Sequence, residues 1–321
     1  MKVSVILTIK NEAASLPALL ESLAAQSRPA DEVIVCDGGS ADGSAAILSA
    51  YRGRLPLRLF KAPGSNISQG RNRAIAAAAG PIIASTDAGV RLTPDWLAEL
   101  VRPIEEGGAA AAAGWFRPAP QTDFETVMGA TVLPDLADID PAAFLPSSRS
   151  AAFLKSAWQA AGGYPEWLDY GEDLVFDLAL RGLYGPFPFA PAAVAHFRPR
   201  PSLAAFGRQY YRYARGDGKA GLWPRRHAVR YLTYFFGLPA LLAMAARGRL
   251  LGWLGLLAAA GLYCRRPAQR LWPLTAGWPP GRRLAGLALI PVILLVGDLA
   301  KMAGYPAGVC WRRTLGRPER L

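Results

Sequence analysis

The sequence has few of the residues that build disulfide frameworks and zinc sites. Its 321 residues include 3 cysteines and 2 histidines. The cysteines Cys36, Cys264 and Cys310 lie far apart, and no CxxC spacing occurs. A disulfide-bonded scaffold and a zinc site are therefore not indicated. This cysteine usage fits a reducing compartment, where disulfides rarely persist.

Acidic residues are scarce relative to basic ones, with 24 Asp and Glu against 36 Lys and Arg and a formal net charge of +12. Such an excess suggests a nucleic acid, an anionic membrane surface or an anionic substrate as partner. After residue 197 the arginines flank apolar stretches, as in "WPRRHAVR", "CRR" and "GRR". This pattern favours a membrane surface over a continuous nucleic-acid patch, so we expect no nucleic-acid partner.

The N-terminus lacks a secretory signal, because the apolar run in "MKVSVILTIKNE" is too short and returns early to polar residues. We therefore expect the first domain to face the cytoplasm, at the inner face of the cell membrane. With 52% hydrophobic and 19% charged residues the chain is not of the disordered class.

The first 115 residues alternate short apolar runs with helical patterns. The runs suit buried parallel strands, and helix-forming segments lie between them. This order predicts a Rossmann-like, doubly wound α/β domain whose ligands bind at the carboxyl ends of the strands. The predicted strands are residues 3–8, 32–37, 57–60 and 82–86.

Polar residues follow three of these predicted strands. Asn11 and Glu12 come after the first, "DGGS" from Asp37 to Ser40 after the second, and Asp87 after the fourth. Such residues are also common in ordinary turns, but their convergence on one edge indicates a ligand site. A dehydrogenase is the weaker interpretation, because GxGxxG is absent and the glycines follow the second strand.

These segments resemble glycosyltransferase family 2, whose members are inverting enzymes of the GT-A fold that use nucleotide-diphosphate sugars. The resemblance runs from "VSVILTIKNEAASLPALLESLAAQSRPADEVIVCDGGSADGS" through "GRNRAIAAAAG", "TDAGVRLTPDWL" and "GGYPEWLDYGEDLVFDLALRG" to "RQYYRYARGDGKAG". It covers roughly residues 3–221. Each motif is weak alone, and the ordered set is fairly specific.

The resemblance implies a donor site at the carboxyl edge. Asp37 would face the nucleotide base, Arg71 would lie near the nucleotide, and Asp87 would be the first acid of the family's Asp-x-Asp motif. The residues assigned to donor binding are Thr8, Asn11, Glu12, Asp37, Gly38, Ser40, Arg71 and Asp87.

Transfer of a sugar to an alcohol requires the acceptor hydroxyl to lose its proton, and a positioned carboxylate is the usual base. By resemblance Asp173 in "GEDLVFDLALRG" is this base, and Glu172 orients the acceptor or shifts the pKa of its neighbour. A negatively charged helix start favoured by the helix dipole is the plainer alternative. The "SSR" from Ser147 to Arg149 precedes a predicted strand, and the resemblance places it beside the acceptor. A plain loop explains it equally well, and we assign no catalytic residue there.

Residues 202–216 predict an amphipathic helix with aromatic residues on one stripe and arginines on another, a pattern suited to a membrane interface. Gln209, Arg212 and Tyr213 also resemble the Gln-x-x-Arg-Trp motif of polysaccharide synthases. In that interpretation Arg212 would stabilise the leaving diphosphate. A solvated helix face remains the alternative.

The composition changes after residue 221, and residues 231–246, 250–264 and 284–300 are apolar on all sides. Sixteen residues of helix rise about 24 Å, short of the roughly 30 Å of bilayer hydrocarbon, so spanning, interfacial and re-entrant helices all remain open. Buried helices of a soluble fold are a further alternative. The predicted domains are therefore a GT-A domain over 1–221 and a membrane-associated helical region over 222–321.

The combined prediction is a membrane-associated inverting glycosyltransferase that moves a sugar from a nucleotide-diphosphate sugar, in the first instance a UDP-sugar, to a lipid-linked or envelope glycan acceptor. The alternative is a non-catalytic membrane protein that binds nucleotide sugars. Gly89 stands where the family carries its second metal-binding acid. The diphosphate charge would then be met by Mn²⁺ or Mg²⁺ held by Asp87 and His196, or by Arg212 and Arg71 alone.

Overall fold

The computed structural model describes residues 1–315, which form two compact units. The first comprises Met1–Ala119 and Leu136–Arg198, and the second comprises Pro120–Asp135 and residues 199–315. The boundary predicted at residue 221 differs from this division. Helix α8 (Leu203–Ala220) packs along α12 (Pro280–Thr314), and this contact groups α8 with the C-terminal helices.

The first unit is built on an eight-stranded mixed sheet with the order β3-β2-β1-β4-β7-β6-β8-β5. The first four strands in this order are parallel, as predicted, whereas β4–β7, β6–β7 and β5–β8 pair antiparallel. The strands are β1 (Val3–Ile9), β2 (Glu32–Asp37), β3 (Leu57–Lys61), β4 (Ile82–Ser85), β5 (Val90–Leu92), β6 (Ala111–Pro118), β7 (Ala151–Leu154) and β8 (Phe189–Phe197).

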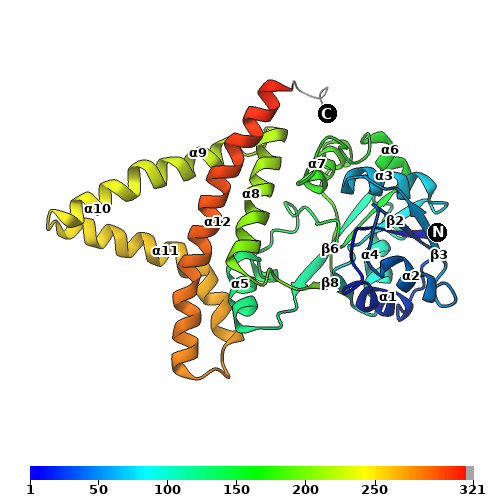
Figure 1. The fold of residues 1–321 in the computed structure, drawn as a ribbon, viewed down its shortest axis with the longest axis horizontal. Helices are drawn as coiled ribbons and strands as arrows, with labels where there is room; N and C mark the ends of the chain where they lie inside the picture. The colour runs from blue at the N-terminus through cyan, green and yellow to red at the C-terminus, as the bar shows by residue number, and fades with distance from the viewer. Residues whose placement is uncertain (316–321) are drawn as a thin grey trace. The chain divides into compact units, whose positions relative to one another are not determined.

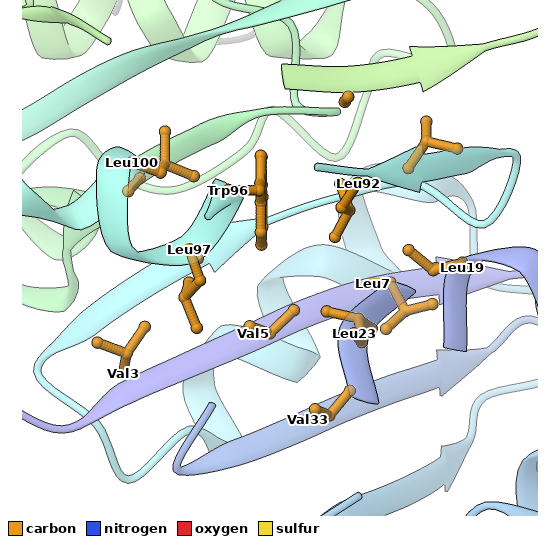
Figure 2. Packing of buried hydrophobic residues seen from close by; sticks show 14 of the residues in the cluster. Val3, Val5, Leu7, Leu19, Leu23, Val33, Leu92, Trp96, Leu97 and Leu100 are labelled. Carbon is orange, nitrogen blue, oxygen red and sulfur yellow. The ribbon is translucent and has the colours of Figure 1, made fainter. Parts of the chain in front are cut away.

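Helices cover both faces of this sheet, so the central strands are apolar on both sides. One core contains Val5, Leu7 and Trp96 and is covered by α1 and α4 (Figure 2). The other contains Ile6, Ile83 and Phe176 and is covered by α3, α6 and α7. The helices are α1 (Leu16–Ala24), α2 (Ser44–Ala50), α3 (Ile67–Ala77), α4 (Trp96–Glu105), the 3₁₀ turn η1 (Leu136–Asp138), α6 (Lys155–Ala160) and α7 (Glu172–Tyr184).

The regular elements of the second unit, within its described residues, are all helices. Figure 1 shows α9 and α10 running outward and α11 returning beside them, as a helical hairpin. A π-helical turn, η2, joins α9 to α10, and Gly248 takes a φ of 71° in the connection to α11. The elements are α5 (Asp123–Val132), α8, α9 (Pro224–Leu232), η2 (Thr233–Gly237), α10 (Leu238–Ala246), α11 (Leu250–Leu274) and α12.

Glycines set the close approach of α8 and α12. A Cβ atom added to Gly308 would lie 2.0 Å from the carbonyl oxygen of Arg215, and one added to Gly304 would lie 2.2 Å from that of Tyr211. No side chain fits at these positions, because real Cβ atoms do not approach backbone so closely. The small residues therefore bring the two helix backbones into direct contact.

The aromatic stripe predicted on residues 202–216 lies on α8. Phe206 is 1% exposed, and its ring lies 4.2 Å from that of Tyr210. A Cβ added to Gly297 of α12 would lie 3.1 Å from the Phe206 ring. The amphipathic pattern is confirmed, but α12 covers the part of the stripe formed by Phe206 and Tyr210, which the sequence had assigned to a membrane interface.

Two helical segments are long and apolar enough to cross a membrane by length and composition, Pro224–Ala246 and Pro280–Thr314. Exposed large apolar side chains are concentrated in the second unit, where Phe235, Phe236 and Leu262 are 63%, 68% and 73% exposed. Exposed apolar surface on this scale is unusual for a soluble protein and marks an interaction surface.

Candidate active site

Asp37 ends β2 at the carboxyl edge of the sheet and is 2% exposed. Its Oδ1 accepts hydrogen bonds from Gly39 N at 3.0 Å, Ser40 N at 2.8 Å and Ser40 Oγ at 2.8 Å. Gly39 has a φ of +98°, which favours glycine. The "DGGS" turn therefore holds the carboxylate in one orientation.

The loop after β1 is tied to this turn. Asn11 N donates to Ser40 Oγ at 2.9 Å, and Ala41 N donates to Asn11 Oδ1 at 2.8 Å. Asn11 itself adopts a φ of 58°, which asparagine tolerates better than most residues. The next residue, Glu12, accepts a 2.5 Å bond from Ser15 Oγ. The structure thus brings together the two loops that the sequence assigned to the donor.

Thr8 and Gly38 lie at the same edge. Thr8 pairs with Cys36 in the parallel register of β1 and β2, and Gly38 N donates to the Ile9 carbonyl at 2.9 Å. A Cβ on Gly70 would lie 2.7 Å from Thr8 Cγ2, so this glycine lets α3 approach β1. That approach places Arg71, the next residue of α3, against the sheet.

Arg71 is a buried ion-pair partner. It is 2% exposed, and it donates to Glu172 Oε1 at 2.7 Å and to Asp87 Oδ1 at 2.9 Å. Burial opposes its positive charge, but the carboxylates of Asp87 and Glu172 outweigh this effect and raise the pKa of Arg71. Both of these donor groups contact carboxylates, and the role of Arg71 as a diphosphate clamp stays a prediction.

Arg71 links Asp87 to the start of α7, where Glu172 and Asp173 follow Gly171. Burial, and then the charge of Asp173, raise the pKa of Glu172 to about 7, although Arg71 acts in the opposite direction. Asp173 is partly exposed, and its Oδ1 accepts from Leu174 N at 2.9 Å. Asp87 and the predicted base thus belong to one charged cluster.

A third carboxyl group lies one turn further along α7. Asp177 is 5% exposed, and its Oδ2 is buried without a hydrogen-bond partner. Burial and the charge of Asp173 raise the pKa of Asp177 well above its usual range. The spacing of four residues between Asp173 and Asp177 is the sequence signal that places both on one side of the helix.

Arg149 belongs to the segment that the resemblance placed beside the acceptor, without a catalytic role. Ser85 of β4 pairs with Ala151 of β7 in an antiparallel register. Two residues beyond this pair on the two strands are Asp87 and Arg149, so continuing the register places them opposite each other. Arg149 Nε lies 3.7 Å from Asp87 Oδ2. The side chain thus faces the oxygen of Asp87 that Arg71 does not hold.

The residues of the predicted metal site, Asp87 and His196, both lie beside positively charged groups. Asp87 Oδ1 and Oδ2 face Arg71 and Arg149 respectively. His196 lies on β8 in register with Arg91 and Arg117, and burial, followed by these two charges, lowers its pKa. Among residues 1–315 no group of three or more His, Cys, Asp or Glu side chains is arranged to hold a metal ion. A metal held by Asp87 and His196 stays a prediction.

Gln209, Arg212 and Tyr213 lie on α8 of the second unit. Gln209 Nε2 donates to Tyr213 Oη at 2.6 Å, and Arg200 Nε donates to Gln209 Oε1 at 3.0 Å. The spacing of four residues along the helix therefore produces a local hydrogen-bonded pair, as such spacing does on any helix surface. A diphosphate-binding role for these residues stays a prediction.

Solved structures with similar folds identify the architecture. The mannosyltransferase PcManGT from Pyrobaculum calidifontis, in complex with GDP-Man and Mn²⁺, is 21% identical with a TM-score of 0.62, and the match covers 94% of this chain and 87% of that one. TarS residues 1–349 from S. aureus, in complex with UDP-GlcNAc, is 17% identical with a TM-score of 0.54, covering 100% and 93%. The sheet and these likenesses define the GT-A fold class.

Within that class, residues 4–147 match the family described as Glycosyl transferase family 2, and the chain thus carries a domain of this family. A curated relative, the undecaprenyl-phosphate 4-deoxy-4-formamido-L-arabinose transferase of Serratia proteamaculans (strain 568), is 35% identical over 113 residues. That match covers 33% of this chain and about a third of the relative's length, 34%. The family resemblance found in the motifs is confirmed.

Proposed function

We propose that this chain is an inverting glycosyltransferase that moves a sugar from a nucleotide-diphosphate sugar to a lipid-linked acceptor at a membrane surface. The observation that carries the proposal is the Arg71 bridge, which ties Asp87 at the end of β4 to the start of α7. The end of β4, proposed to bind the donor, and the start of α7, proposed to carry the base, are thereby held together. Transfer of a sugar between two bound molecules requires such proximity.

The chemistry follows from the placement of Asp173. As the acceptor hydroxyl oxygen attacks the anomeric carbon, Asp173 takes its proton. The bond from the anomeric carbon to the diphosphate oxygen breaks, and its electron pair leaves with the nucleoside diphosphate. Attack on the face opposite the leaving group inverts the anomeric centre. Glu172, paired with Arg71, fixes the first turn of α7 and so positions the base.

Donor recognition is assigned to the turn after β2 and the loop after β1. The Asp37 carboxylate is oriented by its own turn to accept from a base N–H, which suits uracil in a UDP-sugar. Similar solved structures contain UDP-GlcNAc and GDP-Man, so both nucleotide classes belong in the test. Thr8, Asn11, Glu12, Gly38 and Ser40 complete the proposed nucleotide site.

The second unit is proposed to enter the membrane from the cytoplasmic side without crossing it. The apolar run at residues 284–297 of α12 rises about 20 Å, less than the roughly 30 Å of hydrocarbon. It ends at Asp298, which accepts from Arg230 Nε at 2.8 Å and Tyr263 Oη at 2.5 Å. An ionised group is costly at the bilayer centre, so insertion into one leaflet is favoured.

A lipid-linked acceptor fits this placement. The curated relative is named for undecaprenyl phosphate as acceptor, and an acceptor with a long hydrocarbon chain would lie in the same leaflet as α10 and α11. A base at Asp173 fits a hydroxyl on such an acceptor, because a phosphate monoester has its second pKa near 6 and is already ionised at pH 7.

The test is a transfer assay on membranes that contain the full chain. Radiolabelled UDP- and GDP-sugars are incubated with these membranes and with extracted lipid acceptors, and label in the organic phase is counted. Transfer from one donor, absent in membranes without the chain, is expected. Donor binding without transfer from any donor would favour the non-catalytic nucleotide-sugar-binding protein instead.

A further inference from the structure

Residue 89 provides neither a ligand nor an obstruction beside Asp87. A Cβ atom added to Gly89 would meet no other atom within 4 Å. The position is therefore open, and an acid there would fit sterically. In this chain Asp87 has no second carboxylate at that spacing, yet a diphosphate leaving group still develops negative charge that the site must stabilise.

Arg149 occupies the space on the other side of Asp87. Its Nε lies 3.7 Å from Asp87 Oδ2, and its Nη1 donates to Ser147 Oγ at 3.1 Å. The guanidinium carbon lies 4.6 Å from the centroid of the Phe197 ring at the end of β8. The side chain is 22% exposed, so it is held on two sides and still reaches solvent.

Two guanidinium groups flank Asp87. Arg71 shares its charge between Asp87 and Glu172, so it already has two carboxylates. Arg149 adds a second guanidinium at the same edge, where the β4–β7 register places it opposite Asp87. A guanidinium presents N–H groups in a planar fork that matches two phosphate oxygens.

We propose that Arg149 supplies the positive charge on the donor diphosphate that a divalent cation would otherwise supply, so that this chain binds and uses its donor without a metal. The inference rests on the proposed function. When the sugar leaves, the Arg149 N–H groups donate to the diphosphate oxygens that receive the electron pair of the broken bond, while the acceptor proton passes to Asp173. No cation is consumed or required.

The test measures binding of UDP and GDP to the full chain in detergent by calorimetry, with EDTA and with Mn²⁺. For the nucleotide that binds, the wild-type Kd should agree within twofold under the two conditions. Arg149→Met should weaken binding at least tenfold, and Arg149→Lys should weaken it less. Arg91→Met, which removes an exposed arginine from β5, the strand that pairs with β8, is the matched control and should stay within twofold. Thermal unfolding of each variant checks that it is folded.

A double variant tests whether donor binding can be made dependent on a metal. In Arg149→Met combined with Gly89→Asp, Mn²⁺ should restore at least part of the lost affinity and EDTA should remove it. Wild-type binding that EDTA abolishes, or an Arg149→Met variant that binds as tightly as the wild type, would overturn the inference and leave the proposed function standing. Binding of neither nucleotide under either condition would overturn the proposed function and the inference together.

Discussion

The two units place charged and apolar side chains in opposite environments. In the first, the pair Arg71 and Asp87 lies in a sheet-edge site above a buried apolar core. In the second, Phe236 is 68% exposed, while the ion pair of Arg230 and Asp298 lies between helices with each side chain less than one-fifth exposed, 18% and 17%. Apolar residues turn inward in water, whereas a lipid-facing surface can expose them.

The difference supports the proposal that the second unit contacts a membrane. The first unit concentrates paired charges at the carboxyl ends of its strands, where the donor is proposed to bind. The second unit offers apolar surface outward and holds the Arg230–Asp298 ion pair between its helices. Variants that reverse one of these arrangements should therefore affect chemistry in one unit and membrane binding in the other.

Asp173→Asn should have the largest effect. The amide keeps the shape of the carboxylate and cannot accept the proton, so transfer should fall about 10²- to 10⁴-fold. Donor affinity should stay within a few fold. The measurement is kcat together with the donor Kd of the same preparation. Near-wild-type turnover would refute the base assignment and would point to an acceptor that is already ionised, such as a lipid phosphate.

Phe235→Asp combined with Phe236→Asp should release the chain from membranes. Burying one phenylalanine side chain contributes about 1.5–3 kcal/mol, so the vesicle partition coefficient should fall tenfold or more. Leu183→Asp changes a residue of the first unit that is 56% exposed, and it should leave partitioning unchanged. Flotation with phosphatidylglycerol-containing vesicles measures both. Equal losses in the two variants would contradict the division between the units.

Gly308→Ala should destabilise the second unit, because the added methyl group would meet the Arg215 carbonyl. Overpacking of this kind costs about 1–3 kcal/mol. Gly261→Ala in α11 is the control, since its added Cβ meets nothing within 4 Å. That change should be neutral or slightly stabilising. Thermal unfolding in detergent distinguishes them, and a Gly308→Ala variant as stable as Gly261→Ala would show that the contact is not needed.

Stability should also depend on pH. Burial and Asp173 raise the pKa of Glu172 from 4.5 to about 7, so the folded state binds the proton more tightly than the unfolded state. This contribution to stability is complete below about pH 4.5 and is lost as pH rises to about 7, by at most about 3 kcal/mol. Glu172→Gln removes the titration. The stability of this variant relative to the wild type should improve from pH 5 to pH 8, measured by urea unfolding, and a constant difference would argue against the raised pKa.

Much of the first unit could be predicted because its signals are local. The apolar runs that form β1, β2 and β4 are continuous in sequence, and the turn residues from Asp37 to Ser40 follow one of them directly. Parallel strands then bring their ends to the same edge. Family motifs supplied the roles that this geometry does not specify.

The rest depends on contacts between distant segments. Arg149 reaches Asp87 through the antiparallel register of β4 and β7, and no periodicity in the sequence specifies a strand register. The buried charge of Arg71 is paired with Glu172, which lies 101 residues away in the sequence. The stripe on α8 was predicted correctly, but a helix pattern shows only that a face is apolar and not whether α12 or lipid covers it.

The central claim is that the first unit performs the chemistry and the second brings it to acceptors in the membrane. The most direct measurement compares the Phe235→Asp, Phe236→Asp variant with the wild type on two forms of one acceptor, a long-chain lipid in vesicles and a water-soluble short-chain analogue. The account predicts equal rates on the soluble analogue and at least a tenfold loss on vesicles. Equal losses on both acceptors, or no loss on either, would contradict it.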